Sequence, residues 1–159
     1  MGYCTNADVR RFLPRAVVIE GENPTPSARN PNAETLTLGD LAEYIAQADE
    51  YINSKINAIY EVPLKKVNIG GTVKYPSPIP LISARLAAKL VFEQRLSGAD
   101  RQPGEFPKAI YDQAILDLNA VIRGNTRLLG QGSNVSSRFA RSSWHSVPPN
   151  PVKDPPDKA

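Results

Sequence analysis

Side chains suited to acid–base, nucleophilic or metal chemistry are scarce in this chain. His145 is the only histidine and Cys4 the only cysteine among 159 residues. A single histidine excludes His pairs and HExxH zinc sites and weakens the case for any His-based triad. A single cysteine excludes an internal disulfide and a cysteine zinc site. We therefore predict a surface or interface histidine and an unreactive, partly buried thiol in a protein that tolerates a reducing cytosol.

Two short patterns resemble sites but fit ordinary surface better. Glu43, Asp49 and Glu50 have the chemistry of a paired acid and base, yet such carboxylates on a helix usually form a solvated face. Gly130-Gln131-Gly132 lacks the preceding strand and following helix that a phosphate loop requires. We predict no catalytic, metal-binding or cofactor-binding residue, and we do not expect an enzyme.

The bulk composition fits one modest domain with an additional tail. Hydrophobic residues make up 41% of the chain, enough for a core, and no run reaches the roughly 18 apolar residues of a membrane span. Basic and acidic residues balance within residues 1–125, so the net charge of +3 lies in residues 126–159. The high pI of about 9.1 therefore describes the tail and not a basic, nucleic-acid-binding body.

The clearest periodic pattern covers residues 37–60. Thr37 is predicted as the N-cap of a long α-helix, and Asp40 completes a capping box. A one-sided helix of this length needs partners for its apolar face. The residues of that face recur at steps of three and four: Leu38, Leu41, Ile45, Ala48, Ile52, Ile56 and Ile59.

Three further helices are predicted as those partners. A short one follows the cap residue Thr5 and ends before Pro14. A second covers residues 77–98, with Ser77 as its N-cap, and a third covers residues 107–123. We predict an all-α fold, a small antiparallel bundle of three long helices and a short N-terminal one, with an inserted β-hairpin and an extended C-terminal tail.

The inserted hairpin is predicted at residues 65–75. Val67 and Ile69 alternate with polar residues, as do Val73 and Tyr75, and Gly70-Gly71 between them suits a tight turn. A lone two-stranded hairpin is marginal in water, so this one is expected to lie on the helices or on another chain. Upstream, residues 16–19 are β-branched and read as either a strand or a buried connector, and Gly21–Asn32 reads as a surface loop.

The tail, residues 126–159, cannot bury enough apolar surface to order by itself. Large apolar residues are nevertheless spaced along it. We interpret it as an arm that becomes ordered on a partner, with a simple disordered terminus as the alternative. The predicted partner-binding residues are Leu128, Leu129, Val135, Arg138, Phe139, Arg141 and Trp144.

Four segments, in this order and spacing, match one family. They are Tyr3–Val9 with its Tyr, Thr and Ala-Asp-Val residues, Ala48–Leu64 ending in Tyr-x-x-Pro-Leu, Pro80–Ala87, and Tyr111–Ile122. Over about residues 3–125 the chain resembles small bacteriophage head–tail connector proteins, the adaptor or head-completion proteins of Mu-type and related long-tailed phages.

The resemblance implies a virion protein of the head–tail neck, made in the host cytoplasm, with no cofactor. It implies a helical-bundle adaptor domain at residues 1–125, assembled as a homo-oligomeric ring, commonly a dodecamer, beneath the portal. It also implies contacts with the portal protein and with a tail-side connector or tail terminator protein, and a channel that DNA traverses without specific binding. The arm at 126–159 would dock on the portal, partly as an added strand. The hairpin residues Val67, Ile69, Val73 and Tyr75 would face a neighbouring subunit or the channel.

A different class of function remains open from the residues alone. The chain also fits a small nucleic-acid-binding module that uses its basic C-terminal tail. Such a module would bind duplex DNA with an affinity that falls steeply with salt, and deletion of the tail would remove most of the binding. The balanced charge of residues 1–125 argues against this alternative.

Overall fold

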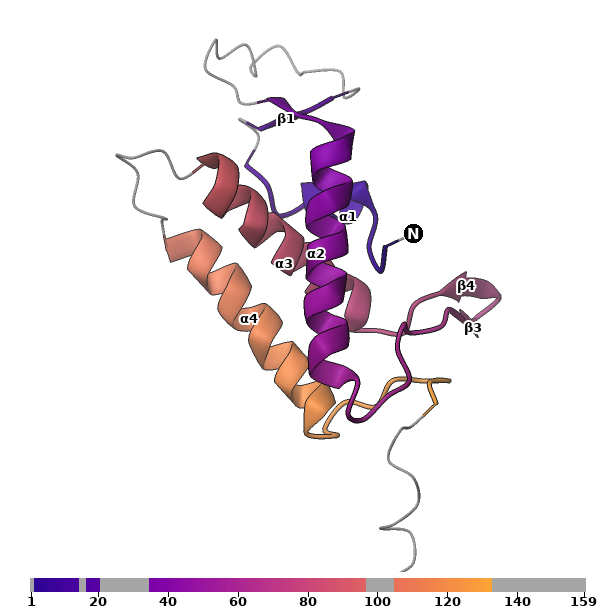
Figure 1. The fold of residues 1–159 in the computed structure, drawn as a ribbon. Coiled ribbons are helices and arrows are strands. Elements are labelled where there is room, and N and C mark those ends of the chain that lie inside the picture. Colours follow the sequence, from indigo (N-terminus) through magenta and orange to yellow (C-terminus); the bar gives the residue numbers. More distant parts are fainter. Residues whose placement is uncertain (1, 15–16, 21–34, 97–104, 133–159) are drawn as a thin grey trace, which may run out of the picture.

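The computed structural model describes residues 2–14, 17–20, 35–96 and 105–132, and the fold there is mostly helical (Figure 1). Its elements in chain order are α1 (Asn6–Arg10), β1 (Val18–Ile19), β2 (Thr35–Leu36), α2 (Leu38–Ile56), β3 (Val67–Ile69), β4 (Thr72–Lys74), α3 (Ile79–Val91), the π-helical turn η2 (Phe92–Leu96) and α4 (Glu105–Ile122).

Both predicted capping boxes are confirmed. The Asp8 amide donates to Thr5 Oγ1 at 3.3 Å, and the Thr5 amide donates back to the Asp8 carboxylate at 3.0 Å. At the start of α2, Thr37 and Asp40 make the same reciprocal pair at 3.0 and 3.4 Å. Each box satisfies backbone donors that have no partner within the helix, so both helix starts are set by local sequence.

The predicted bounds of α2 are longer than the helix itself. Regular helix ends at Ile56, and the chain turns over the next residues to the buried Tyr60. The prediction that Leu38 belongs to the buried face is wrong, because its side chain is 47% exposed. Leu38 is the first helical residue and lies at the end of the apolar stripe, whereas Leu41 one turn later is fully buried.

The predicted start of α3 is also wrong. The helix begins at Ile79, after Pro78, and Ser77 makes no side-chain cap. The carbonyls of Pro76 and Pro78 accept from the amides of Ile79 and Leu81, both at 3.0 Å. Backbone carbonyls thus supply what a capping side chain would supply, and Pro80 has no amide to satisfy. At its other end α3 passes into η2 after Val91.

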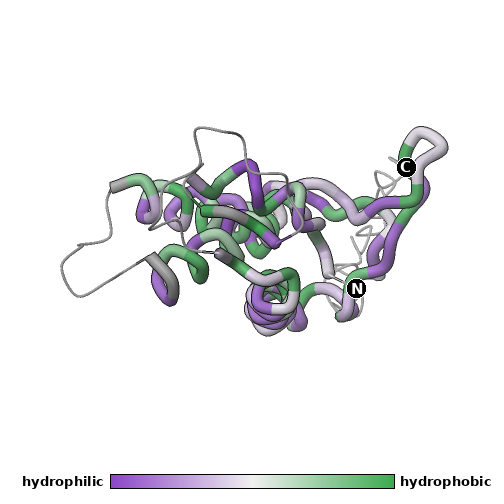
Figure 2. The backbone as a smooth tube through the Cα atoms, turned by 90° about the horizontal axis from the view of Figure 1, so that it is seen from above, coloured by the Kyte–Doolittle hydropathy of each residue, from purple (hydrophilic) through white to green (hydrophobic). Residues whose placement is uncertain are grey.

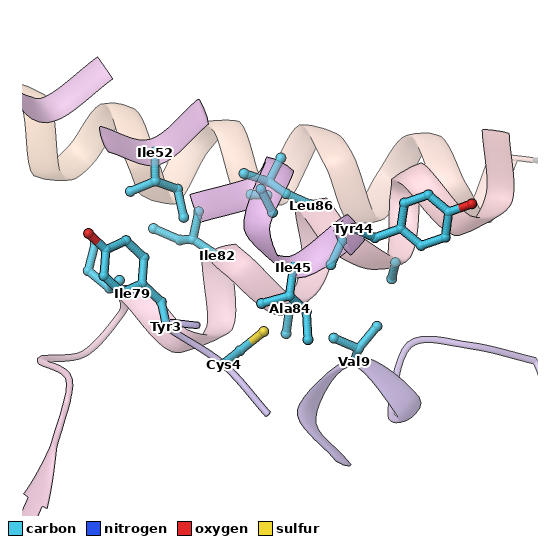
Figure 3. Close-up of a cluster of buried hydrophobic side chains, with 14 of the residues drawn as sticks. Tyr3, Cys4, Val9, Tyr44, Ile45, Ile52, Ile79, Ile82, Ala84 and Leu86 are labelled. Atoms are coloured by element: carbon cyan, nitrogen blue, oxygen red, sulfur yellow. The ribbon is translucent and has the colours of Figure 1, made fainter. Parts of the chain in front are cut away.

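The core is centred on α3. This helix lies between α2 and α4 and contacts both, and α1 packs on it as well (Figure 1). Its own residues are buried over most of its circumference, including Ile79, Ile82, Ala84 and Val91, although Leu81 is 42% exposed. Figure 3 shows α2 and N-terminal side chains converging on it. A helix that is apolar on most of its surface belongs in the interior, so α3 and not α2 is the element around which the other helices pack.

The β structure consists of two separate pairs. β1 and β2 pair in parallel, with Val18 opposite Thr35 and Ile19 opposite Leu36, so the end of the β-branched run at 16–19 is a strand. β3 and β4 form the predicted antiparallel hairpin. Gly70 and Gly71 in its turn have φ of +59° and +82°, a region that glycine enters without strain. The predicted loop at Gly21–Asn32 lies outside the described residues.

Candidate interaction surface

The hairpin is the most exposed regular element of the described chain. It stands clear of the helices in both views (Figures 1 and 2). Val67 and Ile69 on β3 are half-buried, whereas all of β4 is exposed and Val73 is 65% exposed. In the described structure β3 and β4 pair only with each other, so no strand pairs with either outer edge of the hairpin. Open edges with an apolar side chain between them are a template for pairing with another chain.

Aromatic contacts attach the base of the hairpin to the body. The ring of Tyr75 lies edge-on to the ring of Tyr3, with centroids 4.9 Å apart, and Lys66 Nζ lies 5.2 Å from the Tyr75 ring centroid. The Tyr3 hydroxyl accepts from the Leu64 amide at 2.9 Å and donates to Asn53 on α2. Tyr3 therefore joins the N-terminal segment, α2 and the hairpin base.

Residues Leu128–Gly132 form a strap that crosses the base of the hairpin. Gln131 accepts from the Lys65 amide through Oε1 at 2.8 Å and donates to the Lys65 carbonyl through Nε2 at 2.7 Å. The Glu61 amide donates to the Gly132 carbonyl at 3.1 Å. At Gly130 a Cβ atom would lie 2.6 Å from Val67 Cγ1, so the strap backbone touches β3 directly. The packed body thus continues past the predicted boundary at residue 125.

The strap changes the interpretation of the predicted partner-binding arm. The side chain of Leu128 is buried in its own protomer. The Leu128 amide donates a hydrogen bond to the Tyr60 hydroxyl at 3.4 Å. Its side chain is therefore part of this body and is not presented to a partner here. Leu129 is 64% exposed. The other predicted arm residues lie outside the described residues, as does His145: Val135, Arg138, Phe139, Arg141 and Trp144.

A buried polar network lies beneath the N-terminal segment. Asp49 Oδ2 accepts from the Tyr3 amide at 2.7 Å, and Asp49 Oδ1 accepts from the Ser83 hydroxyl at 2.6 Å. Ser83 is fully buried in α3, and its Oγ lies 3.3 Å from Cys4 Sγ. We call Tyr3, Cys4, Asp49 and Ser83 the polar latch, because they tie the N-terminal segment to α2 and α3.

Burial controls the ionisation of the latch. It raises the pKa of the Cys4 thiol to about 11, so Cys4 is a neutral thiol at physiological pH. Burial likewise raises the pKa of the Asp49 carboxyl, against the lowering effect of the Ser83 and Tyr3 hydrogen bonds. An open pocket of about 510 Å³ adjoins the latch, lined by the N-terminal segment, α2 and the hairpin base.

The prediction of a solvated carboxylate face is correct for Glu43 and Glu50, which are exposed, and wrong for Asp49. A sequence signal for this exists. Asp49 lies four residues after Ile45 and three before Ile52, within the apolar stripe of α2, where a carboxylate requires buried partners. Among the described residues, no group of three or more His, Cys, Asp or Glu side chains is arranged to hold a metal.

No protein-family model and no curated protein matches this chain. Within the described ranges, no helix combines the length and the apolar character that crossing a bilayer requires.

Proposed function

We propose that this chain is a structural virion protein, a head-to-tail adaptor that forms a ring beneath the portal, links the capsid to the tail and surrounds a channel for DNA. The single observation that carries the proposal is the open hairpin held on a packed helical body. A subunit of this kind performs no reaction and needs surfaces that recur from copy to copy.

The architecture in this proposal is a small antiparallel bundle of α2, α3 and α4 with the short α1 packed on it. The hairpin is inserted between α2 and α3, and the chain leaves the body through the strap as the arm that reaches the portal. Support comes from the fully buried faces of α3 and from the Gln131 clamp on Lys65, which fixes where the strap crosses the hairpin base. A rigid helical body that holds the hairpin and the strap in fixed positions can align the layers of an assembly that bind to them.

The charge distribution in the sequence supports a DNA channel in preference to a DNA-binding module. Residues 1–125 carry balanced charge, which argues against the net positive body that tight binding to DNA phosphates favours. On the hairpin, the exposed Lys66 and Lys74 give a local positive charge, whereas Lys65 at its base is paired with Glu61 at 3.5 Å. In a channel that charge would meet DNA phosphates without reading bases, which permits passage.

The test uses the full chain co-expressed with a phage portal protein. We expect electron micrographs of the co-purified complex to show a ring of this protein on one face of the portal. Separate single subunits that do not bind portal would contradict the proposal. If the chain instead binds duplex DNA with an affinity that falls steeply with salt and depends on residues 133–159, the nucleic-acid-binding alternative replaces it.

A further inference from the structure

Helix α4 has a second, largely exposed apolar face, which its own protomer contacts at one end, where the Phe106 ring lies edge-on to the Phe92 ring with centroids 6.2 Å apart. Phe106 and Leu116 are 59% and 63% exposed, and Ala109 between them is also exposed. With the half-buried Ala120, they follow helical spacing along the side of α4 away from the core. We call Phe106, Ala109, Leu116 and Ala120 the outer stripe. A helix normally buries one apolar face, so a second one marks a contact surface.

A pocket of about 220 Å³ lies among α2, α3 and α4 on another side of the body. This three-helix pocket is smaller than the roughly 300 Å³ at which small-molecule sites begin, and its size suits one or two side chains. Its walls are mainly apolar and aromatic: Ala48, Tyr51, Leu86, Leu90 and Tyr111, with Lys89 among them.

The outer stripe and the three-helix pocket lie on different sides of the same helix. Tyr111 lines the pocket and Leu116 centres the stripe, five residues later. At about 100° per residue their side chains point about 140° apart around α4. A projection on one side and a recess on another join copies head to tail, and such contacts generate a ring or an open filament but no two-fold dimer.

The charged groups beside these two features are the Lys89–Glu93 pair at the pocket and the exposed Asp112 near the stripe. Lys89 Nζ lies 4.5 Å from the Tyr111 ring centroid and 2.9 Å from the Glu93 carboxylate, at the pocket. Asp112 is exposed one turn before Leu116, and it makes no salt bridge with any described residue. If Leu116 of one copy enters the pocket of the next, Asp112 comes close to Lys89 of that copy.

We infer that the occupant of the three-helix pocket is a second copy of this chain, with its Leu116 in the pocket and its Asp112 facing Lys89. The inference rests on the proposed ring and names the surfaces that close it. It assigns the contact between neighbouring subunits to the helical body, which leaves the hairpin free for the channel or for another layer.

The first test replaces the projecting side chain. Leu116→Glu places a charge in a recess lined by aliphatic and aromatic side chains, so we expect loss of the ring when the full chain is co-expressed with portal. Leu38→Glu is the matched control, because Leu38 is an exposed leucine outside the stripe. Both variants should melt like the parent chain, since each changes a solvent-facing position. Rings formed equally well by the Leu116→Glu and Leu38→Glu variants would overturn the inference.

The second test exchanges the charges. Asp112→Lys and Lys89→Asp should each weaken assembly about tenfold, and the double variant should recover most of the loss because the pair is restored in reverse. Losses that simply add in the double variant would show that these two residues do not meet. Recovery also separates an interface effect from local damage to the Lys89–Glu93 pair.

The third test separates head-to-tail from two-fold association. Gln47 on α2 also lines the three-helix pocket. Under oxidising conditions, a Leu116→Cys, Gln47→Cys double variant should give a ladder of cross-linked multimers, and neither single variant should. Efficient dimers of the Leu116→Cys variant alone would mean that the stripe meets itself, which contradicts the inference. If the parent chain forms no ring with portal, the proposed function is wrong. If the ring forms and changes to the stripe do not affect it, only the proposed interface is wrong.

Discussion

The polar latch and the base of the hairpin are neighbours in this protein, but they differ in burial and in hydrogen bonding within the protomer. In the latch, Ser83 is fully buried and Asp49 accepts hydrogen bonds from two different segments of the chain. In the hairpin, Val73 is 65% exposed and no described strand pairs with either outer edge. Stability is thus concentrated where α3 meets its neighbours, and the exposed element is left available for contacts outside the protomer. Four predictions test that division.

The largest difference in stability is expected between a core residue and a hairpin residue. Ile82 is fully buried in α3, and Ile82→Ala should lower the free energy of unfolding by about 3 kcal/mol because it leaves a cavity. Val73→Ala on β4 should change it by less than about 0.5 kcal/mol. Chemical denaturation of both variants measures the difference, and equal losses would refute the division.

The latch is the next most sensitive point. Asp49→Ala leaves the Tyr3 amide and the Ser83 hydroxyl without their acceptor, and we expect a loss of about 2 kcal/mol in the free energy of unfolding. Glu50→Ala changes the exposed neighbouring carboxylate and serves as the control. If both substitutions cost the same, the latch does not stabilise the fold.

The raised pKa of Asp49 gives this site a pH dependence of known sign. The folded protein favours the protonated carboxyl, so the contribution of Asp49 is greatest below its ordinary pKa of 3.8 and is lost as pH rises through the raised folded value. Relative to Asp49→Asn, the parent chain should lose unfolding free energy between acidic pH and neutrality. Parallel stability curves for the two proteins over that range would show that the pKa is not raised.

The smallest effect is expected at the strap. Gln131→Ala removes both hydrogen bonds to Lys65 and should cost about 1 kcal/mol. Hydrogen exchange should show faster exchange at the Lys65 amide while amides of α3 keep their protection. Leu129→Ala, at an exposed strap residue, should leave that amide unchanged. Unchanged exchange in the Gln131 variant would mean that the strap is held by other contacts.

The features that the sequence predicts well are those set by neighbouring residues. The Thr5 and Thr37 capping boxes depend on residues three positions apart, and the Gly70-Gly71 turn depends on its own backbone freedom. The apolar stripes of the helices likewise follow from local spacing.

The features that sequence reasoning missed depend on distant partners. Asp49 accepts hydrogen bonds from Tyr3 and Ser83, which lie 46 and 34 positions away in the sequence. Gln131 bonds the backbone of Lys65, 66 positions away. The start of α3 was missed because the caps are the backbone carbonyls of Pro76 and Pro78, which no side-chain pattern encodes. Among the predicted interaction residues, Val67, Ile69, Val73 and Tyr75 lie together on the hairpin and at its base. Leu128 is internal because the strap folds back on Tyr60.

The central claim is that this chain is a subunit of a ring and performs no reaction. Native mass spectrometry of the full chain mixed with a portal protein, which measures the mass of any complex that forms, tests this proposal most directly. We expect a closed set of copies bound to one portal, a dodecamer by the resemblance to connector proteins. A chain that stays a lone subunit in the presence of portal would contradict the account.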